Sequence, residues 1–141
     1  VLTLEEDNLP PADGLLKLYK NMDKYDVVGG LYWSKSDDGF PMLFGNPENG
    51  PDDAKPQPPI YGEVQPVNAM GMGFNLFKLD MFRKIEQPWF KTVEERNVDG
   101  TTVVNTQDMF FYKKALDAGY KIACDTSVLV GHYNLSNDTV Y

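Results

Sequence analysis

Short apolar runs typical of β-strands alternate along this chain with segments of helical periodicity. Strands are expected at residues 1–4, 26–33, 64–67, 74–78, 121–124 and 128–133. Helices are expected at 15–22, 80–85 and 106–118. Alternation of this kind is typical of an α/β fold in which helices flank a mixed sheet. We therefore predict a single α/β domain over residues 1–141.

Two segments fit neither pattern. Residues 34–59 hold most of the prolines and many acidic residues, so we expect a long loop with one short strand at Phe40–Phe44. The part of this loop from Ser36 to Pro59 is expected to contact either an acceptor molecule or only solvent. Residues 88–105 are expected to be irregular.

Composition and charge exclude several classes of protein. At 42% hydrophobic and 13% aromatic residues, the chain can form a substantial core. The net charge of -8 argues against nucleic acid and anionic membranes as partners. A phosphorylated substrate stays allowed, because a bound divalent cation inverts the local charge. No run approaches the roughly 20 apolar residues of a membrane span, and no signal peptide is visible, so we expect a cytoplasmic protein.

The single cysteine, Cys124, lies in an expected strand and is predicted to be an inert core thiol.

Acidic residues follow the first expected strand. Side-chain alternation places Glu5 and Asp7 on one side of the strand and Glu6 on the other. Two carboxylates at the carboxyl end of a strand can hold a divalent cation such as manganese or magnesium. Ligands of open α/β sheets bind at these ends. An exposed acidic turn would explain the same residues without a ligand.

Two further side chains could take part in chemistry. Asp108 lies in the first turn of the helix expected at 106–118, with Thr106 as its N-cap. A helix N-terminus favours an ionised carboxylate, which can accept the proton of an attacking hydroxyl. His132, the single histidine, ends an apolar run, and imidazole ligates manganese or zinc beside carboxylates. Without a functional role, Asp108 is explained as a charge favoured by the helix dipole, and His132 as a hydrogen-bonded core histidine.

Glycine and tryptophan residues suggest where a ligand could approach. Gly71 and Gly73 flank Met72 and would permit positive φ or close approach of the backbone to a ligand. An ordinary bend or bulge explains them equally. Trp33 and Trp89 could stack on sugar rings or lie in the core, and the core is expected for Trp33.

In this order, the segments resemble the second half of a GT-A-fold glycosyltransferase of the family-2 type. Residues 4–11 (LEEDNLPP) are similar to its strand ending in DxD, with two prolines and a helix following. Residues 27–30 resemble the next strand, 69–74 (AMGMGF) the loop beside the donor sugar, and 77–82 the helix start after it. Residues 106–111 (TQDMFF) correspond to its xED region, and 118–122 with 128–132 to its AGYKI…V-x-H ending.

The resemblance implies a partial GT-A fold and a role for each matching residue. Asp7, His132 and Glu5 would bind manganese or magnesium at the diphosphate of a nucleotide-sugar donor. Asp108 would deprotonate a hydroxyl of a carbohydrate or other acceptor, with inversion at the anomeric carbon. The residues implied in donor or acceptor binding are Glu5, Gly71, Met72, Gly73, Gln107 and Trp89.

The chain also departs from the family pattern. Glu5-Glu6-Asp7 replaces Asp-x-Asp, and Gln107 replaces the usual glutamate before the base. The family's N-terminal nucleotide-binding half has no counterpart here, so we expect a truncated domain. Self-association or a partner segment would then cover its exposed sheet edge. Two other functional hypotheses stay open: a non-catalytic carbohydrate- or metal-binding module, and a nucleotidyltransferase of similar fold.

Overall fold

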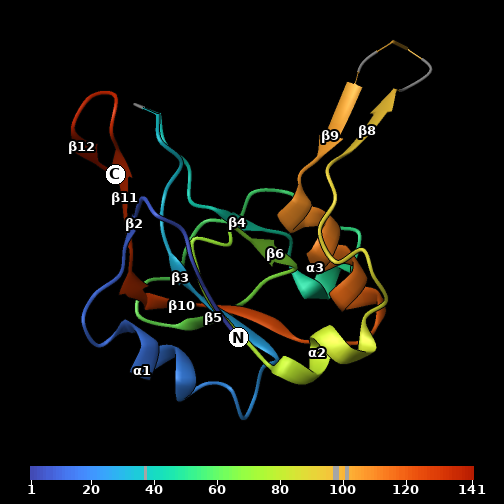
Figure 1. The fold of residues 1–141 in the computed structure, drawn as a ribbon, viewed down its shortest axis with the longest axis horizontal. Helices are drawn as coiled ribbons and strands as arrows, with labels where there is room; N and C mark the ends of the chain where they lie inside the picture. Colours follow the sequence, from blue (N-terminus) through green and yellow to red (C-terminus); the bar gives the residue numbers. More distant parts are fainter. Residues whose placement is uncertain (37, 97–98, 101) are drawn as a thin grey trace.

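A mixed five-stranded sheet forms the centre of the molecule (Figure 1). The computed structural model describes residues 1–36, 38–96, 99–100 and 102–141. The strand order is β1 (Leu2–Leu4), β7 (Phe74–Phe77), β3 (Val27–Leu31), β10 (Ile122–Leu129) and β5 (Val64–Pro66). β10 runs parallel to β3, and the other neighbouring pairs are antiparallel. The predicted α/β class with a mixed sheet is therefore confirmed.

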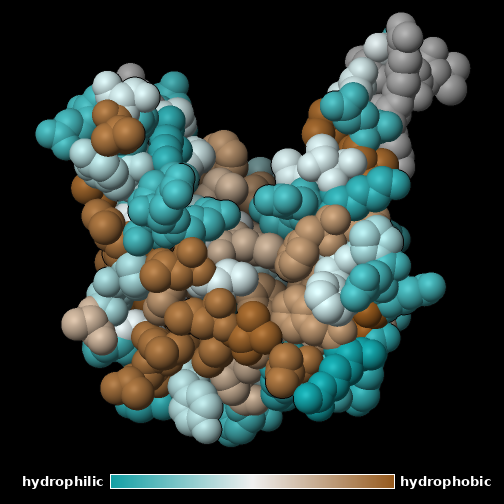
Figure 2. All heavy atoms as spheres, viewed as in Figure 1, coloured by the Kyte–Doolittle hydropathy of each residue, from teal (hydrophilic) through white to brown (hydrophobic). Residues whose placement is uncertain are grey.

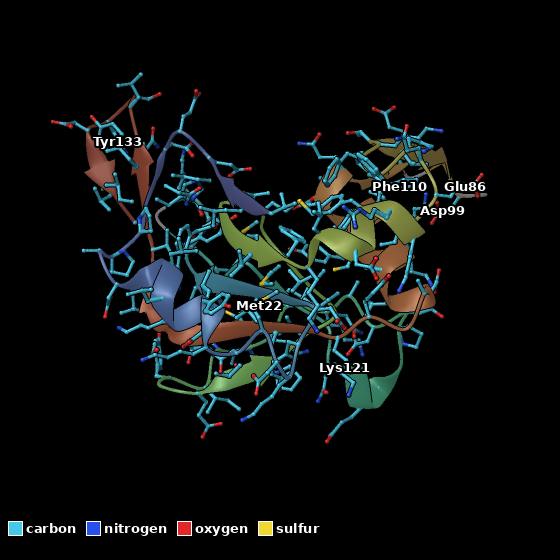
Figure 3. The ribbon with its side chains drawn as sticks, turned by 60° about the horizontal axis from the view of Figure 1, so that its bottom comes forward. Met22, Glu86, Asp99, Phe110, Lys121 and Tyr133 are labelled. Carbon is cyan, nitrogen blue, oxygen red and sulfur yellow. The ribbon has the colours of Figure 1, made fainter. Side chains whose placement is uncertain are left out.

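Helices cover both faces of this sheet because its central strand is apolar on both sides. Val28 packs in a cluster with Leu18 of α1 (Gly14–Tyr19). The adjacent Val27 faces the opposite way, into a larger cluster that includes residues of α2 (Leu79–Lys84) and α3 (Gln107–Asp117). Figure 3 shows Met22 between α1 and the sheet, well away from Phe110 on α3.

The face under α2 and α3 is rich in aromatic rings. Phe111 and Tyr112 of α3 are fully buried, and the Phe111 ring lies 5.7 Å from that of Phe77 on β7. Phe82 of α2 stacks on Phe111 at 5.3 Å. These large rings fix the position of α3 on the sheet, because each of them buries much apolar surface.

Smaller sheets surround the central one. β11 (Gly131–Asn134) lies between β2 (Asn8–Leu9) and β12 (Thr139–Val140). β4 (Leu43–Phe44) pairs with β6 (Ala69–Met70), and a 3₁₀ helix, η1, covers Pro47–Asn49. β8 (Val93–Arg96) and β9 (Thr102–Asn105) form a hairpin that extends from the domain beyond the start of α3 (Figure 1).

Several sequence expectations need correction. The strand at residues 1–4 is not buried, because it is an edge strand on which Leu2 and Leu4 are 42% and 55% exposed. Residues 122–129 form one strand rather than two short ones, with its pairing to β3 shifted after Asp125. Part of the supposedly irregular segment 88–105 is the β8–β9 hairpin. Residue 37 of the long loop and residues 97, 98 and 101 lie outside the described part of the chain.

The ends of α3 and the burial of Cys124 agree with the sequence predictions, whereas the length of α1 does not. α3 begins after Thr106 and ends before Gly119, whose φ of 83° suits glycine at a helix end. Cys124 is buried as expected, and burial raises the pKa of its thiol well above the usual range. α1 is shorter than predicted and leaves Leu15 and Tyr19 exposed, so only part of its apolar stripe packs on the sheet.

Apolar side chains also reach the surface. Figure 2 shows them gathered on the face where the N-terminus and α1 lie. The exposed residues of β1 and α1 include Leu2, Leu4, Leu15 and Leu16. In the part of the chain that the structure describes, each helix is too short or too polar to cross a bilayer.

Candidate functional site

An open hollow lies between the end of β1 and the start of α3. Its volume is about 610 Å³. The lining residues are Leu2, Thr3, Leu4, Glu5, Met72, Phe90, Thr106, Gln107 and Asp108. The structure therefore brings together four residues that the sequence selected from three separate segments: Glu5, Met72, Gln107 and Asp108.

Asp7 lies in the turn that follows β1 and contacts two basic side chains. Its Oδ2 accepts a hydrogen bond from the Lys35 ammonium, and the two groups form an ion pair. The Nε2 atom of His132 lies 3.9 Å from the same oxygen. The hydrogen bond from Lys35 lowers the pKa of Asp7, so this carboxylate stays ionised at neutral pH.

Sheet pairing places His132 beside this acidic turn. On β11, His132 is the register partner of Asn8 on β2, which directly follows Asp7. Its Nδ1 lies 2.6 Å from the carbonyl oxygen of Trp33. Because a carbonyl can only accept, Nδ1 carries the proton of this hydrogen bond, and in neutral imidazole the lone pair is left on Nε2. The ring is therefore oriented with a potential ligand atom toward Asp7.

Glu5 connects the turn with the hollow. Partial burial raises the pKa of its carboxyl, and the negative charges of Asp7 and Asp108 raise it further. His132 and Lys35 act in the opposite direction. Five ionisable groups from four segments thus lie close enough to influence one another, which is typical of functional clefts.

Asp108 lies in the first turn of α3, at the rim of the hollow. Its Oδ1 accepts hydrogen bonds from the Thr106 hydroxyl and from the backbone N–H of Met109, the latter at 2.9 Å. Thr106 is the N-cap residue as predicted, but its side chain makes no capping bond and donates to Asp108 instead. The carboxylate is therefore held in one orientation beside the hollow.

The two glycines lie where the protein's own side chains leave no room for a Cβ. Neither Gly71 nor Gly73 has positive φ. A Cβ on Gly71 would lie 1.9 Å from the Tyr32 hydroxyl oxygen, and one on Gly73 would lie 2.2 Å from Asn8 Oδ1. Both glycines are thus explained by close packing against the protein's own side chains. Tyr32 also accepts a hydrogen bond from the Gly73 N–H at 3.1 Å.

Both tryptophans pack against apolar or aromatic side chains of the protein. Trp89 packs on Phe82, with ring centroids 5.4 Å apart, and its indole N–H donates to Ile85 O at 2.9 Å. It does not line the hollow, whereas the next residue, Phe90, does. Trp33 packs against the core as expected.

Asp7 and His132 supply two of the donor types that divalent cations accept. Carboxylate oxygen and imidazole nitrogen are both ligands of manganese, and Asp7 Oδ2 and His132 Nε2 lie 3.9 Å apart. Among the described residues, no group of three or more His, Cys, Asp or Glu side chains is placed to hold a metal ion. Glu5 does not complete such a group. A bound cation would need its other ligands from water or from substrate oxygens, which is common for Mg²⁺ at phosphate sites.

Sequence reasoning missed Lys35, Phe90 and Thr106 as parts of the site. Lys35 follows the end of β3 by four residues, and the carboxyl end of a central strand is where ligand-binding side chains gather. That rule could have identified Lys35, since it carries the only cationic side chain between residues 25 and 54.

Comparison with known proteins supports the fold alone. No family model and no curated protein matches the sequence. Among solved structures, the chain is similar to one described as the crystal structure of A197 from STIV, with a TM-score of 0.60 and 21% identity. The match covers 97% of this chain but only 62% of the other. At this identity the similarity concerns the mixed α/β fold alone.

Proposed function

We propose that this chain is the metal-, donor-sugar- and acceptor-binding part of an inverting glycosyltransferase with a GT-A-like fold. It would transfer a sugar from a nucleotide-diphosphate donor to an acceptor hydroxyl. The proposal rests on the convergence of Glu5, Asp7, Asp108 and His132 around one edge of the sheet. These residues are separated by up to 127 positions in the chain (132 − 5).

Three of these residues, Asp108, Asp7 and His132, have a role in the proposed reaction. Asp108 accepts the proton of the acceptor hydroxyl, whose oxygen then forms the new bond to the anomeric carbon. The bond from that carbon to the diphosphate breaks on the opposite side, and the nucleoside diphosphate leaves with the electron pair. A divalent cation held by Asp7 and His132 would stabilise the charge on this leaving group.

Lys35 affects how a cation can bind. Its ammonium already neutralises Asp7, so a metal ion has to displace it from Oδ2. A displaced ammonium beside the metal would be available to a phosphate oxygen, because lysine is an effective phosphate-binding side chain. Lys35 therefore lowers metal affinity and adds a positive charge for the diphosphate.

The same ion pair supports a second candidate, a non-catalytic carbohydrate- or metal-binding module. If Lys35 holds Asp7 permanently, the hollow could bind a sugar without transfer. Replacement of Asp108 separates the two functions, because only the transferase needs a base there.

Thermal unfolding in the presence of manganese and UDP tests the proposed function. Manganese should raise the melting temperature of the wild type, and UDP should raise it further, because both bind the folded state. A ligand at 100 times its dissociation constant adds about 2.7 kcal/mol. Asp7→Ala should abolish the manganese effect.

Asp13→Ala is a matched control for this experiment. Asp13 also forms an ion pair with a lysine, Lys17 at 2.9 Å, but it lies at the start of α1, outside the hollow. This variant should respond to manganese like the wild type. An equal response in Asp7→Ala, or none in the wild type to either ligand, would contradict the proposal.

A further inference from the structure

The outer edge of β1 is open and forms one wall of the hollow that Asp108 lines. β1 is the end strand of the central sheet, and in the described part of the chain no strand pairs with its outer side. All three residues of β1 line the hollow, and the start of α3 forms the wall across from them. A molecule in this hollow therefore lies against a free sheet edge.

The pairing of β1 with β7 determines which backbone groups of β1 are free. The Glu5 N–H donates to Gly73 O at 3.0 Å, on the side of β7. Because such bonds alternate along an antiparallel pair, the N–H and C=O groups of Leu2 and Leu4 point away from β7. These outward groups recur about every 6.8 Å, since a strand rises about 3.4 Å per residue. The backbone of another extended polypeptide has the same repeat and can form hydrogen bonds with them.

β1 lacks the features with which proteins usually protect an edge strand. Its sequence is Leu-Thr-Leu, with no lysine or proline, and its register with β7 is continuous. The opposite edge strand of the same sheet, β5, contains Pro66. Unprotected edges tend to pair with another chain. β1 is therefore suited to strand addition, in which an extended segment lengthens the sheet by one strand.

The face of β1 toward α3 is polar. Thr3 is the register partner of Asn75, whose side-chain amide donates to the Tyr112 hydroxyl of α3 at 2.6 Å. Thr3 and, two residues further on, Glu5 therefore point to the α3 side of the sheet. Glu5 and Asp108 both line the hollow, and among its described lining residues none is basic. Side chains that enter from an added strand are thus expected to be hydroxylated or basic.

The opposite face of β1 is apolar. Leu2 and Leu4 are the register partners of Leu76 and Phe74, which pack in the cluster that contains Leu18 of α1. The side chains of Leu2 and Leu4 are exposed on this face. Apolar side chains of an added strand would cover them. Because successive side chains of a strand point to opposite faces, the added segment should alternate apolar residues with hydroxylated or basic ones.

We infer that an extended polypeptide binds the edge of β1 by antiparallel strand addition. Its apolar residues lie beside Leu2 and Leu4 and form hydrogen bonds with their backbone groups. Its other residues enter the hollow, where a lysine or arginine faces Glu5 with its aliphatic stem on Phe90, and a serine or threonine hydroxyl lies beside Asp108. This polypeptide is the acceptor of the transferase, a part of the inference that rests on the proposed function.

Two other occupants match these features less well. A carbohydrate has no N–H and C=O groups at the repeat of a strand, so it would not pair with the outward groups of Leu2 and Leu4. A second copy of the chain would bring its own net charge of -8 to an edge that already carries Glu5. A segment with basic residues complements this charge.

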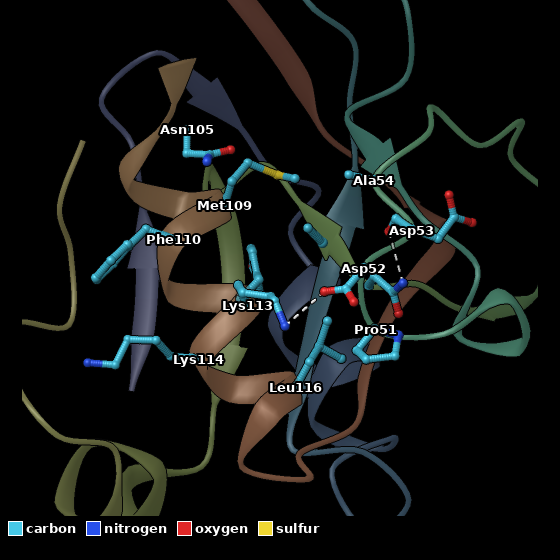
Figure 4. Close-up of a pocket in the computed structure, with 13 residues that line it drawn as sticks. Pro51, Asp52, Asp53, Ala54, Asn105, Met109, Phe110, Lys113, Lys114 and Leu116 are labelled. Atoms are coloured by element: carbon cyan, nitrogen blue, oxygen red, sulfur yellow. Dashed lines mark hydrogen bonds and ion pairs between the residues drawn. The ribbon is translucent and has the colours of Figure 1, made fainter. Parts of the chain in front are cut away.

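The pocket on the other side of α3 provides an internal comparison. Figure 4 shows Met109 and Leu116 facing the loop of residues 51–54, which forms the second wall of that pocket. A loop does not present backbone groups at the regular repeat of a strand. The same polypeptide is therefore not expected to bind there.

An acetylated and amidated hexapeptide, Lys-Val-Ser-Val-Lys-Val, has the expected alternation. Titrated into the ¹⁵N-labelled chain without metal or donor, it should give saturable shifts at the amide signals of Leu2 and Leu4. The signals of Met109 and Leu116 should stay unchanged. A peptide with glutamate in place of both lysines should bind at least about tenfold more weakly, because the hollow is acidic. Absence of a saturable shift at β1 would overturn the inference.

Backbone methylation of the peptide tests strand addition without any change in the protein. In the antiparallel pair the valine N–H groups bond to Leu2 and Leu4, whereas the serine N–H points away from β1. Methylation of the central valine nitrogen, in the fourth position, should weaken binding at least about tenfold. Methylation of the serine nitrogen should not. Equal affinities of the two methylated peptides would exclude strand addition.

The inference and the proposed function can fail separately. Peptide binding without a melting response to manganese and UDP would support strand addition and contradict the transferase. A response to manganese and UDP without peptide binding would overturn the inference and leave the transferase standing. Where both succeed, mass spectrometry should detect sugar on the peptide serine, and transfer to carbohydrates alone would refute the polypeptide acceptor. A chain that sediments as a dimer and gives no peptide shifts would show that a second copy covers β1 instead.

Discussion

The two hollows beside α3 differ in chemistry although they share one helix. The hollow at β1 collects Glu5 and Asp108 and adjoins the ion pair of Asp7 with Lys35. The hollow on the other side of α3, between this helix and residues 51–54, has a volume of about 290 Å³ and is lined mainly by apolar groups. The difference arises from helical spacing, because Gln107 and Asp108 face one hollow while Met109, Lys113 and Leu116 face the other.

Adjacent positions on one helix can thus line hollows of different chemistry, because successive residues are rotated by about 100° around the helix axis. Both hollows depend on how Phe111 and Tyr112 fix α3 against the sheet. A change in that packing should therefore affect both hollows, whereas changes at the rims should affect one.

Loss of the packing under α3 should damage both hollows together. Phe111→Ala should lower the free energy of unfolding by about 3–5 kcal/mol, because it leaves a cavity among Phe77, Phe82 and Tyr112. Phe110→Ala is the control, since the adjacent Phe110 is only partly buried. Denaturant unfolding measures both variants. A similar small loss in the two would mean that α3 is not fixed by its aromatic face.

Replacement of the proposed base should affect only the charged hollow. Asp108→Asn should reduce sugar transfer by roughly 10²–10⁴-fold, because the acceptor proton loses its base. Manganese should still raise the melting temperature. Release of nucleoside diphosphate, tested with a panel of donors, measures the rate.

Asp117→Asn is the control for this variant, because Asp117 lies at the opposite end of the same helix. It should leave transfer unchanged. A wild type that binds manganese and UDP but shows no transfer would favour the non-catalytic module. Transfer that survives in Asp108→Asn would remove this residue from the reaction.

Removal of Lys35 should strengthen metal binding and weaken diphosphate binding. Lys35→Ala frees Asp7 Oδ2, so manganese should bind about tenfold more tightly, equal to about 1.4 kcal/mol. In the absence of metal, UDP should bind less tightly to Lys35→Ala than to the wild type. Calorimetry of manganese and of UDP separates these effects. Lys17→Ala breaks the comparable pair with Asp13 and should change neither affinity. Weaker manganese binding in Lys35→Ala would show that Lys35 and manganese do not compete for Asp7 Oδ2.

The smallest effect is expected from the charge of Glu5. Its pKa lies above the ordinary value of 4.5, chiefly through burial, so the folded state binds its proton more strongly than the unfolded chain does. The protonated form thus favours folding below the raised pKa, and stability from this group decreases as pH rises through the raised value. Glu5→Gln should remove this dependence and be slightly more stable at neutral pH.

Melting temperatures measured from pH 4 to pH 8 would test this prediction. Glu6→Gln is the control, because Glu6 lies in the same turn but does not line the hollow. A pH profile of Glu5→Gln that matches the wild type would show that the pKa of Glu5 is not raised in the folded protein.

Local sequence patterns determined the elements that carry the candidate site. The periodicity of residues 106–118 and the glycine at 119 gave α3, and with it the position of Asp108 in the first turn. The apolar run before Leu31 gave the central strand β3. Such predictions succeed because helix periodicity and strand hydrophobicity depend on neighbours in the chain.

Tertiary structure alone decided which of these residues meet. Lys35 reaches Asp7 across 28 positions, and His132 reaches the Trp33 carbonyl across 99. Tyr32 and Asn8 occupy the space beside Gly71 and Gly73, which the sequence had left open for a ligand. Strand register and side-chain packing fix these contacts, and neither is encoded in local periodicity. The sequence therefore supplied the candidate groups, while the pairing of β2 with β11 and the packing of α3 determined their arrangement.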